Sequence, residues 1–397
     1  MARKANGVAL DLTTLDWPIR VATSSLGGLG VFSSRRIAAG EAVALEAPLA
    51  LTPLFHISRQ ICWWCMEAAT GEQPLLCTGC NTACWCSQRC RDAAATFMTG
   101  DDVLRTPEKR PTVFATGNAH AHGTTECAAL HVWQSAGRPH EDAADLILQA
   151  IRLLDVRQRG AVCRPFWPTS STELGFGSYA ARLCGLTRDR YNGDAIRRSA
   201  AAALNLVPAA ARVGREELED VLSRQQCNVF GVTGPRGVGH GLASFTGAFQ
   251  LLNHSCVPNV AFDSRPIVAA KCGEAGPAGA AAAPPVYSLV ALRDIGVGEE
   301  LTHCYASSSE GPAVRQAYLR AHHGFTCACP RCACDDPLRE LDISERLDAR
   351  RCVSPHCGSG LGVHVRGVDA EEGEGLGLRC VHCGEEWEVE EVADLIG

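Results

Sequence analysis

The chain has 397 residues, of which 46% are hydrophobic, so it is long enough for a packed core and for two or more domains. Its formal net charge of -7 gives no broad basic surface, which argues against non-specific nucleic-acid binding and leaves a cationic peptide open as a partner. Residues 1–6 carry no apolar run long enough for a signal peptide, and no stretch has the length of a membrane span. We therefore expect an intracellular protein of the nucleus or cytoplasm, with no membrane partner.

The chain contains 22 cysteines, most of them in close pairs. In a reducing compartment such pairs indicate zinc sites rather than disulfides. Fifteen of the cysteines fall into the three ligand clusters described below. The others are expected to be structural or surface thiols, namely Cys84, Cys163, Cys184, Cys227, Cys272, Cys304 and Cys334.

Residues 16–55 alternate apolar positions with turns, which predicts short antiparallel strands. A glycine turn, Gly27-Gly28-Leu29-Gly30, interrupts them. By itself this turn could be an ordinary hairpin. It could also be a place where the backbone approaches a ligand closely, because glycine has no Cβ.

The densest run of metal-binding residue types lies between residues 62 and 127. Its candidate ligands are Cys62, Cys65, Cys77, Cys80, Cys86, Cys90, His122 and Cys127. Eight such ligands are enough for two zinc ions. If His122 is a ligand, residues 100–120 would form a surface insertion between it and Cys90. His122 could instead be an ordinary loop histidine, with His120 or Cys84 as a substitute ligand.

From Glu141 to about Gln226 the apolar spacing predicts helices, with a connection near residues 170–177. Strand patterns return at residues 228–232, break at the glycine-rich residues 234–241, and continue at residues 260–262 and 286–291. Residues 273–285 have an Ala/Gly/Pro composition that cannot build a core, so we expect a flexible hairpin tip there.

Polar and thiol side chains gather in one short turn, residues 252–259. Asn253 and His254 can form hydrogen bonds, Cys256 can bind a metal, and Pro258 keeps the preceding residue out of helical backbone angles. This pattern predicts a rigid turn shaped for a ligand.

Two further cysteine groups follow in the C-terminal part of the chain. Cys327, Cys329 and Cys332 are one ligand short of a zinc site, and Cys256 is the natural fourth. Cys352, Cys357, Cys380 and Cys383 supply four ligands on their own, and their paired spacing predicts a zinc ribbon with an acidic loop at residues 371–374.

Four segments in this order resemble the SET-domain protein-lysine methyltransferases: residues 27–32, residues 252–259, residues 298–305 and residues 325–332. The cysteine run that includes Trp85-Cys86-Ser87-Gln88-Arg89-Cys90 resembles a MYND finger. The resemblance extends from about Trp17 to Cys383, and the layout is most similar to the shorter plant-type SET-and-MYND proteins, which end in a pair of cysteine knuckles.

The resemblance implies an α+β fold in which a split SET domain of short β-sheets carries the other modules. The implied division is an N-terminal part of the SET domain at 16–60, a MYND-type zinc finger at 61–127, a helical insert at 128–226, a C-terminal part of the SET domain at 227–310, a post-SET zinc segment at 311–340 and a zinc ribbon at 341–397.

In the MYND family the two zinc sites interleave. The resemblance therefore implies that Cys62, Cys65, Cys86 and Cys90 hold one ion and that Cys77, Cys80, His122 and Cys127 hold the other. This chain departs from the family in the long gap between Cys90 and His122 and in the four residues between His122 and Cys127. In SET domains a cysteine at the position of Cys256 joins the post-SET cysteines around a third ion.

The resemblance also implies a site for S-adenosylmethionine. The expected cofactor-binding residues are Gly28, Leu29, Gly30, Asn228, Asn253, His254, Tyr305 and Phe325. Tyr305 is the expected catalytic residue, although without the flanking motifs it would be taken for a half-buried strand tyrosine. His323 stands where the family often has tyrosine, so the number of methyl groups accepted is expected to differ.

The expected function is the S-adenosylmethionine-dependent methylation of lysine side chains in a histone or another protein, with zinc as a structural metal and with protein partners bound through the finger. The alternative is a SET fold that recruits partners without turnover. A zinc-finger DNA-binding protein is disfavoured, because the fingers lack a basic recognition helix and the chain is acidic, so no sequence-specific nucleic acid is expected.

Overall fold

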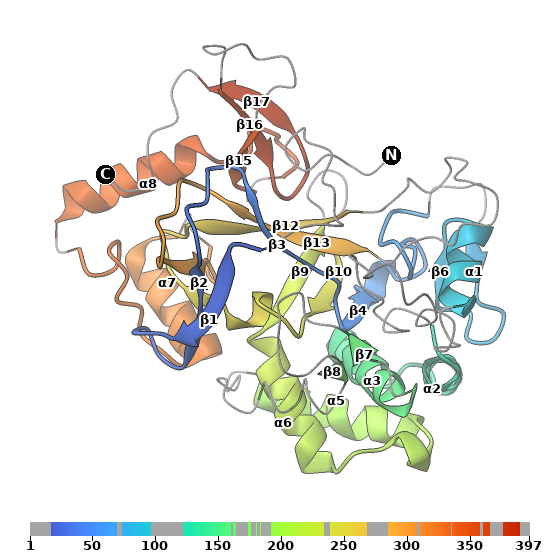
Figure 1. Cartoon of the computed structure of the whole chain (residues 1–397). Helices are drawn as coiled ribbons and strands as arrows, with labels where there is room; N and C mark the ends of the chain where they lie inside the picture. Colours follow the sequence, from blue (N-terminus) through green and yellow to red (C-terminus); the bar gives the residue numbers. More distant parts are fainter. Residues whose placement is uncertain are drawn as a thin grey trace, which may run out of the picture.

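A computed structural model describes residues 17–69, 74–96, 122–159, 162–163, 174–175, 180, 183, 192–233, 239–267, 285–307, 310–334, 336–357, 360–365 and 376–389. The fold is α+β, as expected: small sheets fill the middle of the molecule, and helices from the middle third of the chain pack against one side (Figure 1). The last strands of the chain form a separate small sheet at the opposite side. None of the described helices is both long and apolar enough to cross a membrane.

The strands of the first 55 residues are β1 (Ile19–Thr23), β2 (Leu29–Ser33), β3 (Ala42–Glu46) and β4 (Ala50–Pro53). Those of the second half are β9 (Val229–Thr233), β10 (Gly239–Ser244), β11 (Asn253–His254), β12 (Val260–Ile267), β13 (Val286–Ala291) and β14 (Glu300–His303). They build three sheets, in the orders β1-β2-β14-β11, β4-β10-β9 and β12-β13-β3. Each sheet therefore combines strands from both halves of the chain, which surround one shared apolar core.

One expectation for this region was wrong. The β pattern was expected to break over residues 234–241, but the last three of these residues belong to a strand. Strand β10 already begins at Gly239, while residues 234–238 lie outside the described chain, as do residues 273–284 of the expected hairpin tip. A Cβ at Gly241 would lie 2.4 Å from the carbonyl oxygen of Thr52 on β4. The glycines here therefore permit close strand pairing rather than ending the strand.

The cysteine-rich segment contains the 3-10 turn η1 (Phe55–Ile57), the strand pair β5 (Leu75–Leu76) and β6 (Cys84–Trp85), and α1 (Gln88–Thr96). The helices that follow are α2 (Thr124–Ser135), α3 (Ala144–Arg159), α5 (Gly193–Leu206) and α6 (Arg215–Gln226), with 3-10 turns η2 (Glu141–Ala143) and η3 (Ala209–Ala211). A short strand pair, β7 (Val162–Cys163) and β8 (Leu174–Gly175), lies between α3 and α5. These elements share a second apolar core with the finger cysteines.

Helix α2 differs from the prediction, which started the helices at Glu141. It begins at Thr124 and carries the candidate ligand Cys127. Its buried face includes Ala129, Leu130 and Trp133. The metal-binding residue types at its start concealed the helix, because they gave the segment the composition of a loop. Residues 100–120 of the expected insertion lie outside the described chain.

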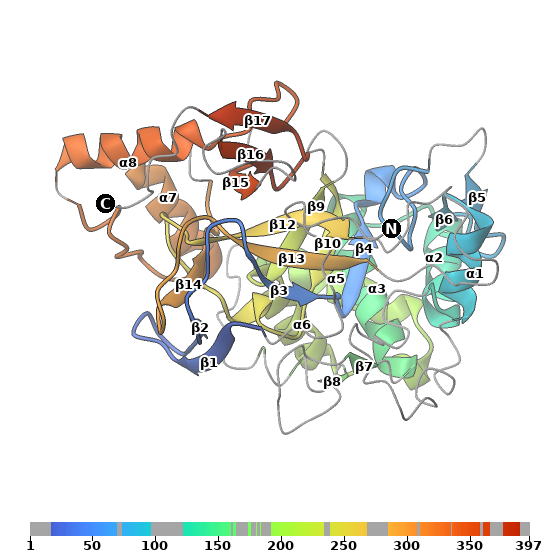
Figure 2. The same cartoon turned by 45° about the horizontal axis from the view of Figure 1, so that its top comes forward.

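The C-terminal part contains the 3-10 turn η5 (Phe249–Leu251) just before β11, then α7 (Pro312–Tyr318), the π-helical turn η6 (Leu319–His323) and α8 (Pro337–Ala349). The chain ends in an antiparallel sheet of β15 (Gly362–Val365), β16 (Leu376–Cys380) and β17 (Glu386–Val389), which we call the ribbon (Figure 2). The ribbon is held against β12 by the ion pair of Arg379 with Asp263, at 3.0 Å, and by the bond from Ser264 N to the Val381 carbonyl, at 3.2 Å.

Candidate functional site

The polar turn at residues 252–259 is fixed by a parallel pairing of β11 with β14, in which His254 lies beside His303. Asn259 completes the attachment. Its side-chain oxygen accepts a hydrogen bond from Thr302 N at 2.8 Å, and its side-chain nitrogen donates to the Glu300 carbonyl at 2.8 Å. Because both ends of this amide bond to the β14 backbone, the turn and the strand that leads to Tyr305 form one rigid unit.

Glu300 joins this unit to the glycine turn. Its carboxylate accepts hydrogen bonds from Ser24 Oγ at 2.8 Å and from Asn253 Nδ2 at 2.7 Å, and Asn253 Nδ2 also donates to the Leu29 carbonyl at 3.1 Å. A Cβ on Gly30 would lie 2.3 Å from the Glu300 Oε1 atom. A side chain at position 30 would therefore displace the Glu300 carboxylate from its hydrogen bonds, while Gly28 is favoured in the turn by its φ of 63°.

Beside this unit lies a pocket of about 610 Å³, which we call pocket A. It is lined by residues 25–29, residues 250–254 and residues 325–329, together with Cys227, Asn228, Tyr305 and His323. All but one of the residues predicted to bind the cofactor line it. The exception is Gly30, which packs against Glu300 and Asn253 instead.

Two asparagines that line pocket A already form side-chain hydrogen bonds within the protein. Asn228 Nδ2 donates to the Arg224 carbonyl at 2.7 Å, at the end of α6. Asn253 Nδ2 is bonded to Leu29 and Glu300, as described above. The amide oxygen of each, which can only accept, is left for a ligand, and Asn228 also keeps one N–H donor.

His254 connects Tyr305 to the cysteine group around Cys256. Its Nδ1 atom accepts a hydrogen bond from Tyr305 N at 3.0 Å, so the ring hydrogen is on Nε2, which lies 3.3 Å from the Cys256 sulfur and donates to it. Burial lowers the pKa of His254 to about 4, so the ring is neutral at physiological pH. The side chain is thus bound inside the protein, as expected if His254 contacts the cofactor through its backbone.

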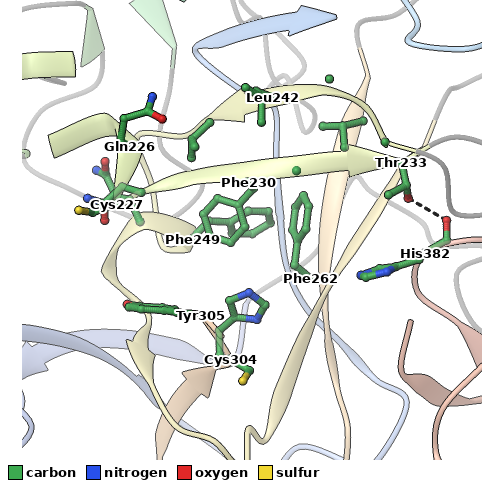
Figure 3. Close-up of a pocket in the computed structure, with 18 of the residues that line it drawn as sticks. Gln226, Cys227, Phe230, Thr233, Leu242, Phe249, Phe262, Cys304, Tyr305 and His382 are labelled. Carbon is green, nitrogen blue, oxygen red and sulfur yellow. Dashed lines mark hydrogen bonds between the residues drawn. The ribbon is translucent and has the colours of Figure 1, made fainter. Parts of the chain in front are cut away.

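Tyr305 lies where pocket A meets a second pocket of about 550 Å³, which we call pocket B. Strand β9 and the rings of Phe230, Phe249, Phe262 and Tyr318 line pocket B, and Tyr305 lies at one end with His382 of the ribbon at the other (Figure 3). Cys227, Asn228, Gln250, Tyr305 and His323 line both pockets. Two ligands bound in pockets A and B could therefore meet beside Tyr305.

The Tyr305 side chain is held by its own contacts. Its hydroxyl donates to the Leu252 carbonyl, and its ring centroid lies 4.8 Å from that of His323. Burial raises the pKa of the hydroxyl well above its usual range, so it stays protonated. His323 is itself buried, at the end of the π-helical turn η6, and Phe325 contacts both rings.

The sequence did not single out several residues that contribute to the two pockets. Tyr318 could have been found, because it is an exposed tyrosine just before the predicted channel residue His323. Gln250 gave no distinct signal, since a glutamine next to an apolar run is common on any surface. Glu300 lies in the segment 298–305 that carried the resemblance, but its bonds to Ser24 and Asn253 beside pocket A were not predicted. Their importance follows from contacts between distant segments.

The four predicted groups of metal-binding residues are each brought together. The groups are Cys62, Cys65, Cys86 and Cys90; Cys77, Cys80, His122 and Cys127; Cys256, Cys327, Cys329 and Cys332; and Cys352, Cys357, Cys380 and Cys383, and within each group the ligand atoms lie within 4.8 Å of one another. The sulfur atoms of the pairs Cys65–Cys86 and Cys77–Cys127 are 3.6 Å apart. Ligands of a tetrahedral zinc ion with Zn–S bonds near 2.3 Å are separated by about 3.8 Å, so the donor sets fit zinc.

His122 is oriented by its neighbours. Its Nδ1 atom lies 2.7 Å from the carboxylate of Glu126, which lies 2.6 Å from Arg152 Nε, and all three side chains are buried. The ring hydrogen on Nδ1 then points to Glu126, and Nε2 faces Cys80 at 3.4 Å. A carboxylate that fixes the ring in this way is typical of histidines that bind zinc.

Cys84, the alternative ligand, is placed differently. Its sulfur donates to the Ile61 carbonyl at 3.1 Å, and burial raises its pKa to about 12, so it is a neutral thiol outside the four groups. His120 lies outside the described residues.

The group around Cys256 lies against pocket A, because Cys327 and Cys329 also line that pocket. A zinc ion with four thiolates carries a net charge of about -2. The buried Arg315 lies 3.9 Å from the Cys332 sulfur and offsets part of this charge, while also pairing with Glu340 of α8 at 3.2 Å. In the ribbon group, backbone N–H groups of His382 and Cys383 donate to the Cys380 sulfur.

Known proteins are similar in sequence to this chain over most of its length. The family model of the SET domain matches residues 28–306. The histone-lysine N-methyltransferase ATXR4 of Arabidopsis thaliana is 26% identical over 340 residues, which cover 80% of this chain and 87% of the relative. The histone-lysine N-methyltransferase SET5 of Scheffersomyces stipitis is 26% identical over 379 residues, covering 86% and 70%. SMYD3 of Homo sapiens, another histone-lysine N-methyltransferase, is 26% identical over 328 residues, covering 78% and 60%.

Proposed function

This chain belongs to the SET-domain family, and we propose that it transfers methyl groups from S-adenosylmethionine bound in pocket A to a lysine side chain that enters through pocket B. The observation that carries the proposal is the meeting of the two pockets at Tyr305. A methyl transfer needs the donor and the amine in line, and the two pockets approach this one residue from different sides.

Bound S-adenosylmethionine supplies an electrophilic methyl group on a sulfonium. The protein must therefore place a neutral amine and exclude water rather than provide a nucleophile. Tyr305 can help to place the amine. Because its hydroxyl hydrogen is donated to Leu252, its oxygen keeps acceptor capacity for the amine hydrogens or the methyl group. The aromatic walls of pocket B suit the aliphatic part of a lysine.

We assign contact with the cofactor to Gly28, Leu29, Asn228, Asn253, His254, Tyr305 and Phe325, which all line pocket A. Main-chain atoms of the glycine turn and the acceptor oxygens of the two asparagines suit a ligand with hydroxyl and ammonium donors. Gly30 supports the turn without contacting the ligand. Zinc would be held by the four groups, and its role in each would be structural because every group supplies four protein ligands.

The substrate is a protein with a target lysine. A histone is the first candidate, because the relatives described above are named histone-lysine N-methyltransferases. Such a substrate places the protein in the nucleus or the cytoplasm. We assign the segment with the first two zinc groups as a MYND-type finger that binds protein partners. None of its described residues lines either pocket, so this assignment gives it no direct part in the transfer.

The test is an incubation of the purified protein with labelled S-adenosylmethionine and either histones or a proteome extract, followed by mass spectrometry of modified lysines. We expect cofactor binding by calorimetry and lysine methylation. Binding without methylation of any protein would favour the non-catalytic scaffold. Absence of cofactor binding in a folded, zinc-loaded protein would remove the proposed function.

A further inference from the structure

His303 is one of the polar side chains of pocket B, whose described lining residues include neutral polar and aromatic side chains but no Asp, Glu, Lys or Arg. It lies two residues before Tyr305, lines pocket B and does not line pocket A. Its ring centroid is 6.3 Å from that of Tyr305 and 5.7 Å from that of Phe230. His303 is therefore on the side of Tyr305 that the peptide would occupy, away from the cofactor.

The hydrogen bonds of His303 leave one nitrogen without a partner. The ring bonds to the backbone of Val260, whereas Nδ1 is buried and has no hydrogen-bond partner among the described residues. Because Nδ1 has no partner, we assign the contact with Val260 and the ring hydrogen to Nε2, which leaves Nδ1 as an acceptor. Burial lowers the pKa of this histidine to about 4, so the ring remains neutral. A buried acceptor without a donor is costly, and native proteins rarely keep one unless a ligand or water completes it.

The rest of pocket B limits which donor can complete it. No Asp, Glu, Lys or Arg is among the described residues that line the pocket. The end away from Tyr305 is lined by His382 of the ribbon, whose carbonyl accepts a hydrogen bond from Thr233 Oγ1 at 2.8 Å (Figure 3). A charged side chain buried there would lack a counter-charge, whereas a neutral hydroxyl or amide would only need the acceptor that His303 offers.

We propose that His303 is a specificity-determining residue, whose Nδ1 accepts a hydrogen bond from an uncharged donor side chain close to the target lysine: serine, threonine, asparagine or glutamine. The proposal rests on the proposed function, because it takes pocket B as the peptide site. The donor is a neighbour of the lysine and not the reacting amine, since the amine must reach the meeting point of the two pockets, which His303 does not line.

The experiment compares wild type, His303→Leu and His303→Asn on a library of lysine-centred peptides with varied flanking residues, measured by methylation kinetics and separately by calorimetric peptide binding. We expect wild type to prefer one flanking Ser, Thr, Asn or Gln over Val by about tenfold in kcat/KM, mainly through KM. His303→Leu should lose or reverse this preference. His303→Asn, which keeps an acceptor near the position of Nδ1, should restore part of it. His131→Leu, which changes an exposed histidine of α2 outside both pockets, is the matched control.

The outcomes separate this inference from the proposed function. If wild type methylates lysine and His303→Leu keeps the same flanking preference, the role of His303 is overturned and the proposed function stands. A uniform loss across all peptides would also overturn it, because it would indicate an effect on the amine or the fold. Peptide binding with a His303-dependent preference but without methylation would support the inference and remove the function. No flanking preference in either measurement would refute the inference.

Discussion

The zinc groups at the two ends of the molecule are built in different ways. In the finger, all eight ligands come from residues 62–127, and they share a core with the helices α2 and α3. At the catalytic end, Cys256 must be joined by Cys327, Cys329 and Cys332 from a segment that follows much later in the chain. Only the second group lines pocket A. The ligands of the finger are thus close together in the sequence, although its core is shared with later helices, whereas the catalytic group forms only when the C-terminal segment has docked.

This difference has a functional meaning. Because Cys327 and Cys329 of the catalytic group also form a wall of pocket A, we expect pocket A to be complete only when the C-terminal segment has docked. The ribbon contributes to pocket B through His382, which is bonded to Thr233. None of the described residues of the finger lines either pocket.

Removal of one ligand at each end tests this comparison most strongly. We expect four zinc ions per chain in wild type and about one fewer in both Cys329→Ser and Cys86→Ser, measured by elemental analysis. Cys329→Ser should abolish cofactor binding and turnover, because the wall of pocket A is lost. Cys86→Ser should keep cofactor binding in the molecules that remain folded. Equal loss of cofactor binding in the two variants would show that the ends are not independent.

Glu126, the buried carboxylate beside His122 of the finger, offers a test with a smaller expected effect. Glu126→Gln leaves the charge of Arg152 buried without its partner and weakens the orientation of His122. We expect a loss of about 3 kcal/mol in the free energy of unfolding, measured by chemical denaturation. Zinc should also be released to a chelator more readily. The exposed Glu216→Gln on α6 is the control. If the two variants were equally stable, Glu126 would have no role at the metal site.

At the catalytic end, Tyr305→Phe tests the effect of the hydroxyl on turnover without changing a metal ligand. Loss of the hydroxyl should lower turnover by about tenfold or more, equivalent to about 1.4 kcal/mol or more, with zinc content and cofactor affinity unchanged. Single-turnover kinetics and calorimetry measure the two effects. Normal turnover in this variant would leave the fold assignment intact and remove Tyr305 from the mechanism.

Asn253→Ala should instead lower the cofactor affinity more than the turnover. It removes the hydrogen bonds to Leu29 and Glu300 and the acceptor oxygen at pocket A. We expect cofactor affinity to fall by about tenfold, as for one or two lost hydrogen bonds, with a smaller effect on the rate of the bound complex. Titration calorimetry gives the affinity. An unchanged affinity would mean that Asn253 only supports the turn or contributes nothing to binding.

His323→Tyr is expected to have the smallest effect, limited to the products. The His323 ring lies against Tyr305 and lines both pockets, so a larger ring with a hydroxyl changes the space beside the amine. We expect the ratio of mono-, di- and trimethylated lysine to shift by about tenfold or less per added methyl group, measured by mass spectrometry. The same ratio and rate in both proteins would exclude His323 from the channel wall.

Much of the site could be predicted because its chemistry is local in sequence. Two cysteines separated by two to four residues suit one zinc ion, so the membership of the ribbon group, with Cys352-x4-Cys357 and Cys380-x2-Cys383, could be predicted from spacing alone. The Asn253-His254 turn stood out because polar side chains are unusual within apolar, glycine-rich sequence, whereas Tyr305 was identified only through the resemblance of its flanking segments. The start of α2 was missed for the related reason that metal-binding residues concealed its apolar face.

The sequence by itself determined the SET-domain resemblance, the cysteine groups with their implied pairing and most residues of pocket A. Only the tertiary structure decided that Glu126 orients His122, that Asn253 bonds to both Glu300 and Leu29, and that His303 of pocket B has an Nδ1 atom without a hydrogen-bond partner among the described residues. These features depend on contacts between segments far apart in the chain. Spacing along a sequence limits which neighbouring side chains can share a ligand, but it does not determine which distant backbone will satisfy a buried polar atom.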